Sequence, residues 1–277
     1  QPGGQLTITT DVENYPGFPK GIMGPDMMNL FREQAQRFDA ETYYLTVDKV
    51  DLSNRPFKVY VGDDIYVTET IIISTGASAK LLGLDSESRL MGYGVSACAT
   101  CDGFFFKDKK VIVIGGGDSA LEEAIFLTKF ASNVSIIHRR NEFRASKIMQ
   151  ERALKNSKIN VVWNTTIEDM VGDPQNGGLV RVILKDIKSK QTRAFDCDGA
   201  FVAIGHKPNS DLFRNQLELD NKGYIITNAD STKTSIPGVF ASGDIQDTVY
   251  RQAITAAGSG CMAALDAEHF LENQSVE

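Results

Sequence analysis

Cys98 and Cys101 stand three residues apart, and Asp102 follows them directly. Such a pair can be half of a zinc site, an inert pair or a redox-active dithiol. A structural zinc site needs a second pair of ligands, and the other cysteines, Cys197 and Cys261, stand alone, so we expect no metal. A redox role is favoured because a neighbouring sulfur and a helix start lower a thiol pKa towards about 7. Asp102 is then a candidate to move the thiol proton, or simply to cap the helix.

A glycine-rich loop follows shortly after the cysteines. A short apolar strand runs directly into Gly115-x-Gly117-x-x-Ala120. The first glycine permits a tight turn, the second lets a pyrophosphate approach the backbone, and the small third residue lets strand and helix pack closely. Asp118 and Ser119 open the expected helix, whose N-terminus favours negative charge. The pattern predicts a dinucleotide site, with a plain turn as the alternative.

The end of the next expected strand is basic. An NAD site would place an acid about 20 residues after the loop, to bind the ribose hydroxyls. This sequence instead has His138-Arg139-Arg140, with Arg144 one turn further on. Guanidinium groups match a 2′-phosphate, so NADPH is favoured over NADH. The alternatives are a solvated basic patch and, for His138, an ordinary surface histidine.

The cysteine pair and the expected nicotinamide nucleotide need a chemical link. A nicotinamide hydride and a disulfide do not exchange electrons readily, so a carrier that accepts two electrons and passes them on is chemically sensible. A flavin is the usual carrier of this kind. From the residues alone, this step rests on chemistry and on no motif.

The elements expected around the motifs differ along the chain. The first third predicts a helix and a small antiparallel sheet, then a buried strand, at residues 24–40, 42–50, 57–61, 65–67 and 70–77. The middle predicts a βαβ unit and further elements, at residues 111–114, 118–130, 134–138, 145–155, 159–162, 180–184 and 195–204. A closing helix is expected at 252–271, where Gly258 and Gly260 suggest close packing against something flat or bulky.

Two linkers, at residues 80–84 and 205–209, divide the chain. The first and last segments each look incomplete alone. We therefore expect one domain made of residues 1–81 and 208–277, with a second domain, residues 82–207, inserted into it.

The bulk composition is that of an ordinary globular protein, with 277 residues of which 42% are hydrophobic and 23% charged. The net charge of −7 argues against nucleic acid as a partner. No apolar run approaches the ~20 residues that span a bilayer, and residues 1–5 do not resemble a signal peptide. One close cysteine pair among four cysteines favours a reducing, cytoplasmic setting.

Short motifs along the whole chain carry a family resemblance. They are Gly3-Gly4-Gln5-Leu6, Glu13-Asn14-Tyr15-Pro16-Gly17, Ala97-Cys98-Ala99-Thr100-Cys101-Asp102-Gly103-Phe104-Phe105, Gly115-Gly116-Gly117-Asp118-Ser119-Ala120, His138-Arg139-Arg140, Gly238-Val239-Phe240-Ala241-Ser242-Gly243-Asp244-Ile245 and Tyr250-Arg251-Gln252-Ala253. Together they resemble the low-molecular-weight thioredoxin reductases, essentially from end to end.

This resemblance implies an α/β fold of two Rossmann-like, three-layer domains, with an NADPH domain inserted into an FAD domain, in a homodimer that reduces thioredoxin. It implies that Cys101 faces the flavin, that Cys98 attacks the thioredoxin disulfide and that Asp102 manages protons. The implied FAD residues are Gly3, Gly4, Gln5, Asn14, Thr75, Gly76, Ala77, Gly243, Asp244, Arg251, Gln252 and Ala253. The implied NADPH residues are Gly115, Gly117, Asp118, Ser119, Ala120, His138, Arg139, Arg140 and Arg144. Because the dithiol lies on the NADPH domain, that domain must rotate, with hinges near Leu82 and Lys207.

The start of the sequence departs from the family. The family begins with a strand and a Gly-x-Gly-x-x-Gly loop that cradles the FAD pyrophosphate, and this sequence begins after that segment, so a truncated chain is expected. Two alternatives stay open. One is a related flavoprotein that reduces a partner such as a peroxiredoxin, against which the basic stretch at 138–140 argues. The other is a non-catalytic nucleotide-binding or redox-sensing module.

Overall fold

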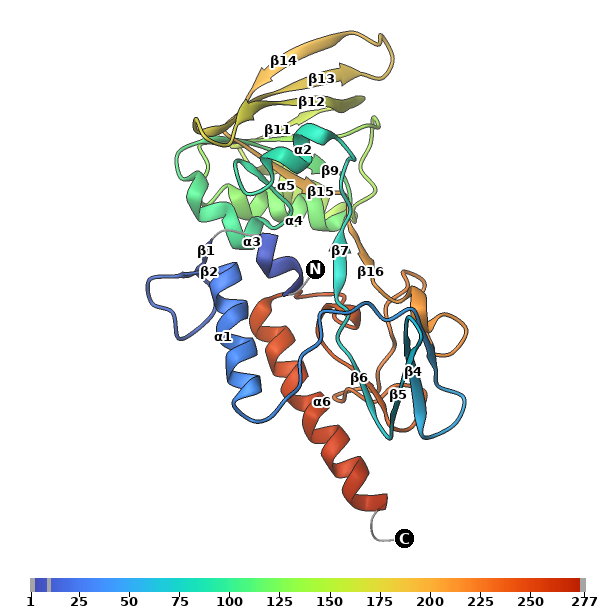
Figure 1. Ribbon diagram of the computed structural model, residues 1–277. Helices are drawn as coiled ribbons and strands as arrows, with labels where there is room; N and C mark the ends of the chain where they lie inside the picture. Colours follow the sequence, from blue (N-terminus) through green and yellow to red (C-terminus); the bar gives the residue numbers. More distant parts are fainter. Residues whose placement is uncertain (1–2, 9–10, 275–277) are drawn as a thin grey trace. The chain divides into compact units, whose positions relative to one another are not determined.

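The computed structural model describes residues 3–8 and 11–274, which form two compact units (Figure 1). Unit 1 comprises the described residues of 1–7, 15–78 and 206–277, and unit 2 those of 8–14 and 79–205. Residues 1–2, 9–10 and 275–277, which include the outer ends of the predicted first domain, lie outside the described residues. Within the described ranges, no helix is both long and apolar enough to cross a bilayer.

Unit 2 is built on a five-stranded parallel sheet. Its strands, in spatial order, are β11 (Ile159–Val162), β10 (Asn133–Ile137), β9 (Lys110–Gly115), β15 (Gly199–Ala203) and β8 (Val95–Ser96). An antiparallel sheet follows, of β12 (Thr165–Asp173), β13 (Gly178–Asp186) and β14 (Thr192–Asp196). The helical elements are α2 (Asp85–Leu90), α3 (Ala99–Asp102), η2 (Gly103–Phe106), α4 (Asp118–Leu127) and α5 (Lys147–Lys155), and a short strand, β1 (Asp11–Val12), precedes them.

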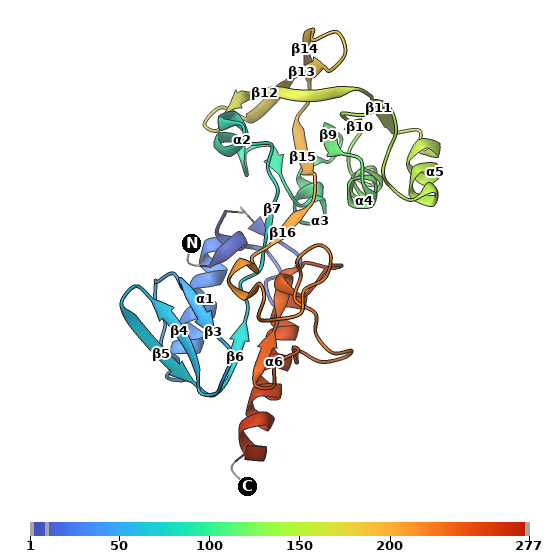
Figure 2. The same ribbon diagram turned by 90° about the vertical axis from the view of Figure 1, so that its right-hand side faces the viewer.

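The parallel sheet is the middle of three layers (Figure 2). Successive residues of a strand point to opposite faces, so Val111 and Val113 pack towards α4, whereas Ile112 and Ile114 pack towards the antiparallel sheet. All four side chains are buried. Each contributes about 1.5–3 kcal/mol of hydrophobic stabilisation. Burial on both faces explains why this strand reads as an unbroken apolar run.

Unit 1 combines a small antiparallel sheet, a parallel strand pair and two long helices. Its elements are η1 (Gly4–Ile8), β2 (Ile22–Met23), α1 (Gly24–Gln36), β3 (Lys49–Asp51), β4 (Phe57–Val61), β5 (Asp64–Thr68), β6 (Ile71–Ile73), β7 (Ala77–Ala79), β16 (His206–Pro208), η3 (Asp211–Phe213), β17 (Val239–Ala241), η4 (Gly243–Ile245) and α6 (Ala253–Gln274). The antiparallel sheet has the order β3-β4-β5, and β6 pairs with β17 in parallel.

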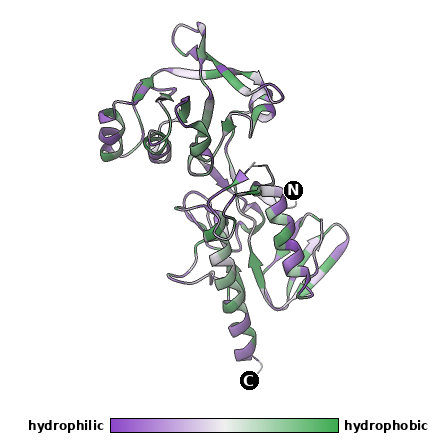
Figure 3. Ribbon diagram, turned by 90° about the vertical axis from the view of Figure 1, so that its left-hand side faces the viewer, coloured by the Kyte–Doolittle hydropathy of each residue, from purple (hydrophilic) through white to green (hydrophobic). Residues whose placement is uncertain are grey.

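Helix α6 packs on β17 through a small apolar cluster. Phe240 of the strand contacts Ala263, Ala267 and Phe270 of the helix. The helix becomes more hydrophilic towards its C-terminal end (Figure 3). The small alanines let the strand approach closely, and this cluster fixes α6 on the β6–β17 pair.

The chain passes between the units at residues 7/8 and 14/15, around a short N-terminal segment, and again at residues 78/79 and 205/206. The two crossing strands, β7 and β16, pair with each other. The N–H of Lys80 donates to the carbonyl of Gly205 at 2.9 Å, and that of Asn209 donates to the carbonyl of Gly76 at 2.9 Å. The two linkers therefore form one short ladder.

Several predicted elements differ from the structure. The helix expected to Ala40 ends at Gln36, because Phe38 and Asp39 turn back on residues 35 and 36 and Asp39 adopts a φ of 62°. Residues 42–48 form no strand, and 70–77 divides into β6 and the start of β7. The expected strand 195–204 is two strands, because Asp198 leaves β14 and hydrogen-bonds Lys110 on β9. Strand β12 was not predicted.

One packing expectation differs from the structure. The spacing of Met27, Leu30 and Phe38 predicts one apolar face on the helix expected at 24–40, and Met27 is fully buried, but Leu30 is 47% exposed and Phe38 is 70% exposed within the described chain. No described atom lies within 4 Å of a Cβ placed at Gly258 or Gly260, so the expected packing of these glycines against something flat or bulky stays a prediction.

Candidate functional site

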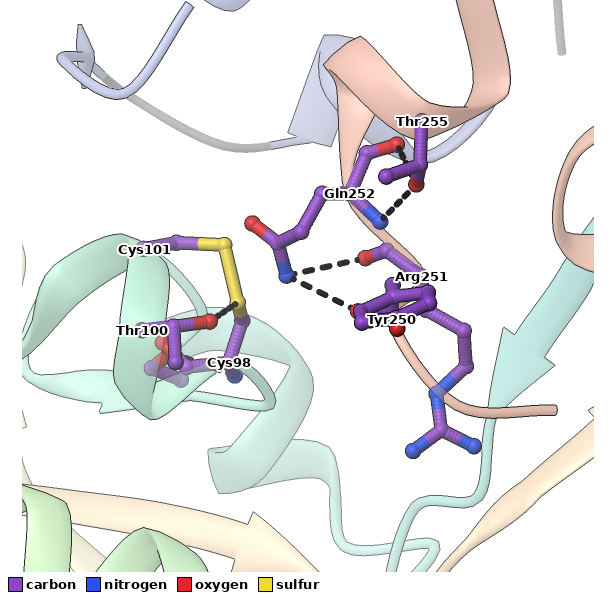
Figure 4. Close-up of a disulfide and its surroundings, with 8 residues drawn as sticks. Cys98, Thr100, Cys101, Tyr250, Arg251, Gln252 and Thr255 are labelled. Carbon is purple, nitrogen blue, oxygen red and sulfur yellow. Dashed lines mark hydrogen bonds between the residues drawn. A yellow bond between two sulfur atoms is a disulfide. The ribbon is translucent and has the colours of Figure 1, made fainter. Parts of the chain in front are cut away.

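Cys98 and Cys101 form a disulfide at the start of α3 in unit 2 (Figure 4). Cys98 immediately precedes the helix and Cys101 lies within it, with their Cα atoms 5.3 Å apart. Both side chains are half-buried. The hydroxyl of Thr100 lies 3.4 Å from the Cys98 sulfur. The pair can cycle between disulfide and dithiol, and its partial exposure leaves it open to attack.

The other two cysteines take no part in this pair. Cys197 is buried, and burial, together with the charges of Asp198 and Asp196, raises the pKa of its thiol to about 12. Cys261 is exposed on α6 as a free thiol. Among the described residues, no group of three or more His, Cys, Asp or Glu side chains is arranged to hold a metal.

Asp102 lies at the end of α3, next to Cys101 in sequence. One of its carboxyl oxygens, Oδ1, is buried without a hydrogen-bond partner among the described residues. Burial raises the pKa of Asp102, and a hydrogen bond from Ser96 opposes that rise. A carboxyl group held closer to neutrality can both take and give a proton, which is what a dithiol–disulfide exchange needs beside it.

The glycine loop joins β9 to α4 in the expected way. A Cβ on Gly115 would lie 2.6 Å from the Cβ of Ala120 and would also clash with the carbonyl oxygen of Ala203. At Gly117, by contrast, nothing lies within 4 Å. Helix α4 begins without a side-chain cap, so its first N–H groups can bind an anion. The loop therefore fits the pyrophosphate of a dinucleotide.

His138 lies beneath this loop and is only 5% exposed. A Cβ on Gly116 would collide with its ring, and its Nε2 lies 3.0 Å from the carbonyl oxygen of Glu142. Burial lowers the pKa of His138, and the nearby charges of Arg140 and Arg144 lower it further. The structure thus places His138 as support for the loop, and its predicted contact with NADPH stays a prediction.

The arginines lie on the segment that follows β10. The side chains of Arg139, Arg140 and Arg144 are exposed. The backbone N–H of Arg144 donates to the carbonyl of Gly116 at 2.8 Å. This bond ties the basic segment to the phosphate loop.

Asp118 makes a second tie between the loop and the basic segment. Its carboxylate accepts the hydroxyl of Ser146 at 2.7 Å and the backbone N–H of Ser146 at 2.9 Å. These hydrogen bonds hold the pKa of Asp118 below its usual value. Loop, His138 and Arg144 therefore form one connected arrangement, with Ser119 exposed at its edge.

In unit 1, the expected flavin residues Gly243 and Asp244 begin the turn η4. Gly243 adopts a φ of +71°, which favours glycine. Burial and the neighbouring charge of Asp247 raise the pKa of Asp244 to about 6, and Arg251 opposes this. Carboxylates near a sugar accept its hydroxyl hydrogens. The carboxylate of Asp244, as a hydrogen-bond acceptor, therefore fits the sugar hydroxyls of a dinucleotide.

The segment that leads into α6 is wrapped around Asp247. Its carboxylate accepts the backbone N–H groups of Val249, Tyr250 and Arg251 at 2.8–2.9 Å. Although burial opposes it, these bonds hold the pKa of Asp247 below its usual value. Arg251 adopts a φ of 49°, an uncommon conformation for a residue with a side chain. The loop is therefore fixed before any ligand binds.

Gln252 and Ala253 lie at the start of α6. The side-chain amide of Gln252 donates to the carbonyl oxygens of Tyr250 and Arg251, and its backbone N–H donates to the hydroxyl of Thr255 (Figure 4). The open space beside Gly258 and Gly260 lies further along the same helix. The hydrogen bonds fix the start of α6, and the open space beside its two glycines leaves room for a bulky cofactor. The residues at the start of α6 therefore agree with the binding of FAD.

The remaining expected flavin residues are more scattered. Thr75 is tied to Asn209, since its hydroxyl donates to the Asn209 carbonyl at 2.9 Å and its own carbonyl accepts the Asn209 amide at 2.8 Å. Gly76 has a φ of +69° and open space around it, and Ala77 is buried in β7. Gly3, Gly4 and Gln5 lie in or beside η1 of unit 1, and Asn14 belongs to unit 2.

Comparison with known proteins agrees with these features. A family described as "Pyridine nucleotide-disulphide oxidoreductase" matches residues 1–260. The thioredoxin reductases of Rickettsia bellii and Rickettsia conorii are 57% and 54% identical over 272 residues, covering 98% of this chain and 88% of each relative. The crystal structure of thioredoxin reductase from Streptococcus pyogenes aligns with a TM-score of 0.92 at 38% identity, over 99% of this chain and 88% of that one.

The chain belongs to the thioredoxin reductase family. The resemblance carried by the motifs is therefore confirmed, and so is the predicted fold class of two FAD/NAD(P)-binding α/β domains. The Cys98–Cys101 disulfide fits membership of this family. The individual site residues stay predictions.

Sequence reasoning missed several residues that hydrogen-bond the predicted site residues of each unit. They are Ser96, Ser146, Asn209 and Asp247. A serine inside an otherwise apolar strand directly before the cysteines was a usable signal for Ser96. For Asn209 no local pattern existed, because its partner Thr75 lies far away in the sequence.

Proposed function

We propose that this chain is a thioredoxin-disulfide reductase, which passes electrons from NADPH through FAD to the Cys98–Cys101 disulfide and on to thioredoxin. The observation that carries the proposal is the disulfide on α3, in the same unit as the open loop at Gly117. Family membership supports it, since relatives at 54% and 57% identity are thioredoxin reductases.

NADPH is held by unit 2. Gly115 and Gly117 bring the backbone and the N-terminus of α4 to the pyrophosphate, and the exposed Arg139 and Arg140 bind the 2′-phosphate. A free carboxylate at those two positions would instead repel the phosphate. Unit 2 is therefore the NADPH domain.

FAD is held by unit 1. Asp244 accepts hydrogen bonds from cofactor hydroxyls, and Arg251, Gln252 and Ala253 present a fixed helix start to it. When bound, the flavin supplies the two-electron transfer between nicotinamide and disulfide. Unit 1 is therefore the FAD domain.

The chain's own sulfurs carry out the exchange with thioredoxin. The Cys98 thiolate attacks the thioredoxin disulfide, so that one new S–S bond forms as the old one breaks, and Asp102 gives a proton to the leaving thiolate. Cys101 then attacks the Cys98 sulfur and releases the second thioredoxin thiol. The Cys98–Cys101 disulfide is restored, and thioredoxin has gained two electrons and two protons.

The family resemblance supports three further proposals. The enzyme is a homodimer and works in the cytoplasm. The NADPH domain rotates about the two crossing strands, so that the dithiol meets the flavin in one pose and thioredoxin in another.

The test is steady-state reduction of thioredoxin by NADPH with the flavin-loaded enzyme. Cys98→Ser should abolish thioredoxin turnover while NADPH still bleaches the flavin absorbance. Cys261→Ser, which removes the exposed free thiol, is the matched control and should keep full turnover. Unchanged turnover in Cys98→Ser would refute the nucleophile assignment, and turnover with peroxiredoxin in place of thioredoxin would refute the substrate.

A further inference from the structure

Thr100 lies between the two redox cysteines in the sequence, and its side chain reaches the sulfur of the first. The hydroxyl oxygen of Thr100 lies 3.4 Å from the Cys98 sulfur (Figure 4). A disulfide sulfur carries no hydrogen, so in this contact the hydroxyl donates and the sulfur accepts. Within residues 3–8 and 11–274, no group is hydrogen-bonded to the Cys101 sulfur. The two sulfurs of the disulfide therefore have different surroundings.

The backbone of Cys98 is held in place by hydrogen bonds that do not involve its sulfur. Its N–H donates to the hydroxyl of Ser96 at 3.0 Å, and its carbonyl accepts the N–H of Asp102 at 3.1 Å. Ser96 ends strand β8 and is only 4% exposed, so this support is buried. Opening the disulfide breaks neither bond. The Cys98 sulfur therefore stays within reach of the Thr100 hydroxyl after reduction.

The elements around the cysteine pair carry no cation. A reactive thiolate is commonly stabilised by a neighbouring Lys, Arg or protonated His. None of these residue types occurs in the described elements β8, α3, η2 and α4, of which η2 and α4 pack on α3. The ionisable groups of these elements, apart from the two cysteines, are all acids: Asp102 on α3, and Asp118, Glu122 and Glu123 on α4.

The Thr100 hydroxyl offsets the influence of these acids. Negative charge nearby raises the pKa of a thiol, whereas a hydrogen bond donated to the charged form lowers it. Hydrogen bonds to ionised groups are also stronger than those between neutral groups. The contact between Thr100 and Cys98 should therefore strengthen when the sulfur becomes a thiolate.

We propose that Thr100 is a further catalytic residue, whose hydroxyl donates to the Cys98 sulfur and stabilises it as the attacking thiolate. The inference rests on the proposed function. Two electrons, which come from NADPH, and one proton convert the disulfide to one thiolate and one thiol. The hydroxyl places the negative charge on Cys98, and the proton stays on Cys101. The Cys98 thiolate then forms an S–S bond with one thioredoxin sulfur, and the thioredoxin disulfide breaks as the other sulfur leaves.

The test titrates the Cys98 thiol in the flavin-loaded full chain. Cys101→Ser and Cys261→Ser leave Cys98 as the accessible thiol, since Cys197 is buried. The rate of alkylation by iodoacetamide is measured from pH 5 to pH 10, and peptide mass spectrometry places the label. In this background, Thr100→Val should raise the thiol pKa by roughly one unit and slow alkylation at pH 6 by roughly fivefold. At pH 10, where the thiol is ionised in every variant, the rates should converge.

Two further variants separate the hydroxyl from the shape of the side chain. Thr100→Ser retains the hydroxyl and should restore the pKa of the parent chain. Thr192→Val is the matched control, because Thr192 is also an exposed threonine of unit 2 and lies on strand β14. It should leave the titration unchanged. If Thr100→Val does not fold, Thr100→Ala provides the second removal of the hydroxyl.

Turnover supplies the remaining arm. With Cys101 and Cys261 restored, Thr100→Val should lower kcat/KM for thioredoxin by roughly fivefold at pH 6, in step with the lost thiolate, and leave KM for NADPH unchanged. A thiol pKa that Thr100→Val does not change, or a shift that Thr100→Ser does not reverse, would overturn the inference. A wild-type enzyme that does not reduce thioredoxin would instead overturn the proposed function, and the thiol titration would still decide whether Thr100 stabilises the Cys98 thiolate.

Discussion

Burial and hydrogen bonding separate the carboxyl groups of this chain into two kinds. Asp102 and Asp244 are half-buried with few donors, and the partial burial raises the pKa of each. Asp247 and Asp266 are each surrounded by N–H and O–H donors, which hold the pKa below its usual value although burial opposes them. Both raised groups lie where the proposed chemistry needs a proton carrier or a hydroxyl partner. The two lowered groups fix loops.

The first prediction contrasts Asp244→Asn with Asp266→Asn. The pKa of Asp244 rises from 3.8 in the unfolded chain to about 6 in the folded protein. The protonated group therefore contributes its full stabilisation below pH 3.8, and this contribution is lost as the pH rises through about 6. Asp244→Asn should therefore gain stability relative to the wild type between pH 4 and pH 7. Asp266 accepts three hydrogen bonds from Ser231 and Thr232, so Asp266→Asn should cost roughly 1–3 kcal/mol at pH 7.

Urea unfolding at pH 4.5 and pH 7 measures the effect of Asp244, and urea unfolding at pH 3 and pH 4.5 measures the pH dependence of Asp266, which lies below the unfolded value of 3.8. The pH dependence of the Asp266 contribution has the opposite sign. Because its pKa is lowered in the folded protein, Asp266 stabilises the protein at pH values above its unfolded-state pKa, and this stabilisation is lost at more acid pH. If the two asparagine variants changed with pH in the same direction, the assignment of the two environments would be wrong.

At the scale of single residues, the sequence predicted those residues whose roles follow from their spacing along the chain. Cys98 and Cys101 sit one turn apart, so their pairing followed from their positions. Ser96 could not be assigned, because no spacing pattern indicates that its hydroxyl accepts the backbone N–H of Cys98. The partners of Asp266 lie more than thirty residues distant.

At the scale of secondary-structure elements, the two glycines in the turn between β9 and α4 have different surroundings. Gly115 is enclosed by Ala120 and Ala203, whereas Gly117 faces open space. The pattern predicted both glycines from one rule. The structure shows that the first serves the packing of strand against helix, and that nothing lies within 4 Å of a Cβ placed at the second. The ends of elements were less predictable, because turns such as that at Asp198 depend on tertiary hydrogen bonds.

The second prediction follows from this difference. Gly115→Ala should destabilise the protein by about 1–3 kcal/mol, since the new methyl group overpacks a closed site. Gly117→Ala should leave the thermal midpoint nearly unchanged, because nothing lies nearby and its φ is −97°. It should instead raise KM for NADPH. Thermal unfolding and steady-state kinetics of both variants separate the two roles, and equal destabilisation would contradict them.

The third prediction concerns the basic segment after β10. Replacing Arg139 and Arg140 by glutamine should raise KM for NADPH by roughly tenfold or more, since each charged hydrogen bond contributes about 1.5–3 kcal/mol. KM for NADH should change far less. Arg152→Gln, an exposed arginine on α5 of the same unit, is the control and should change neither value. Equal effects on both nucleotides would mean that these arginines do not bind the 2′-phosphate.

For the whole molecule, the decisive feature is the pair of crossings at residues 78/79 and 205/206. The crossings are short, and β7 and β16 pair with each other. A domain inserted by two adjacent strands can turn while each core stays intact, since few backbone torsions lie between them. The sequence predicts linkers at residues 80–84 and 205–209. Their mutual pairing was not visible there, because it joins residues more than a hundred positions apart.

The last prediction tests whether turnover depends on the freedom of these crossings. Gly205 has a φ of +104° with nothing within 4 Å of a Cβ, and Gly177, in the turn between β12 and β13, has a φ of +89° and the same open surroundings. Alanine at either position should cost about 1–2 kcal/mol of backbone strain. Only Gly205→Ala should lower kcat with thioredoxin, because only there must the backbone change during rotation, and KM for NADPH should stay the same. Stopped-flow and steady-state kinetics of both variants decide this. An equal loss of kcat in the two would show that strain alone, and not the crossing, limits turnover.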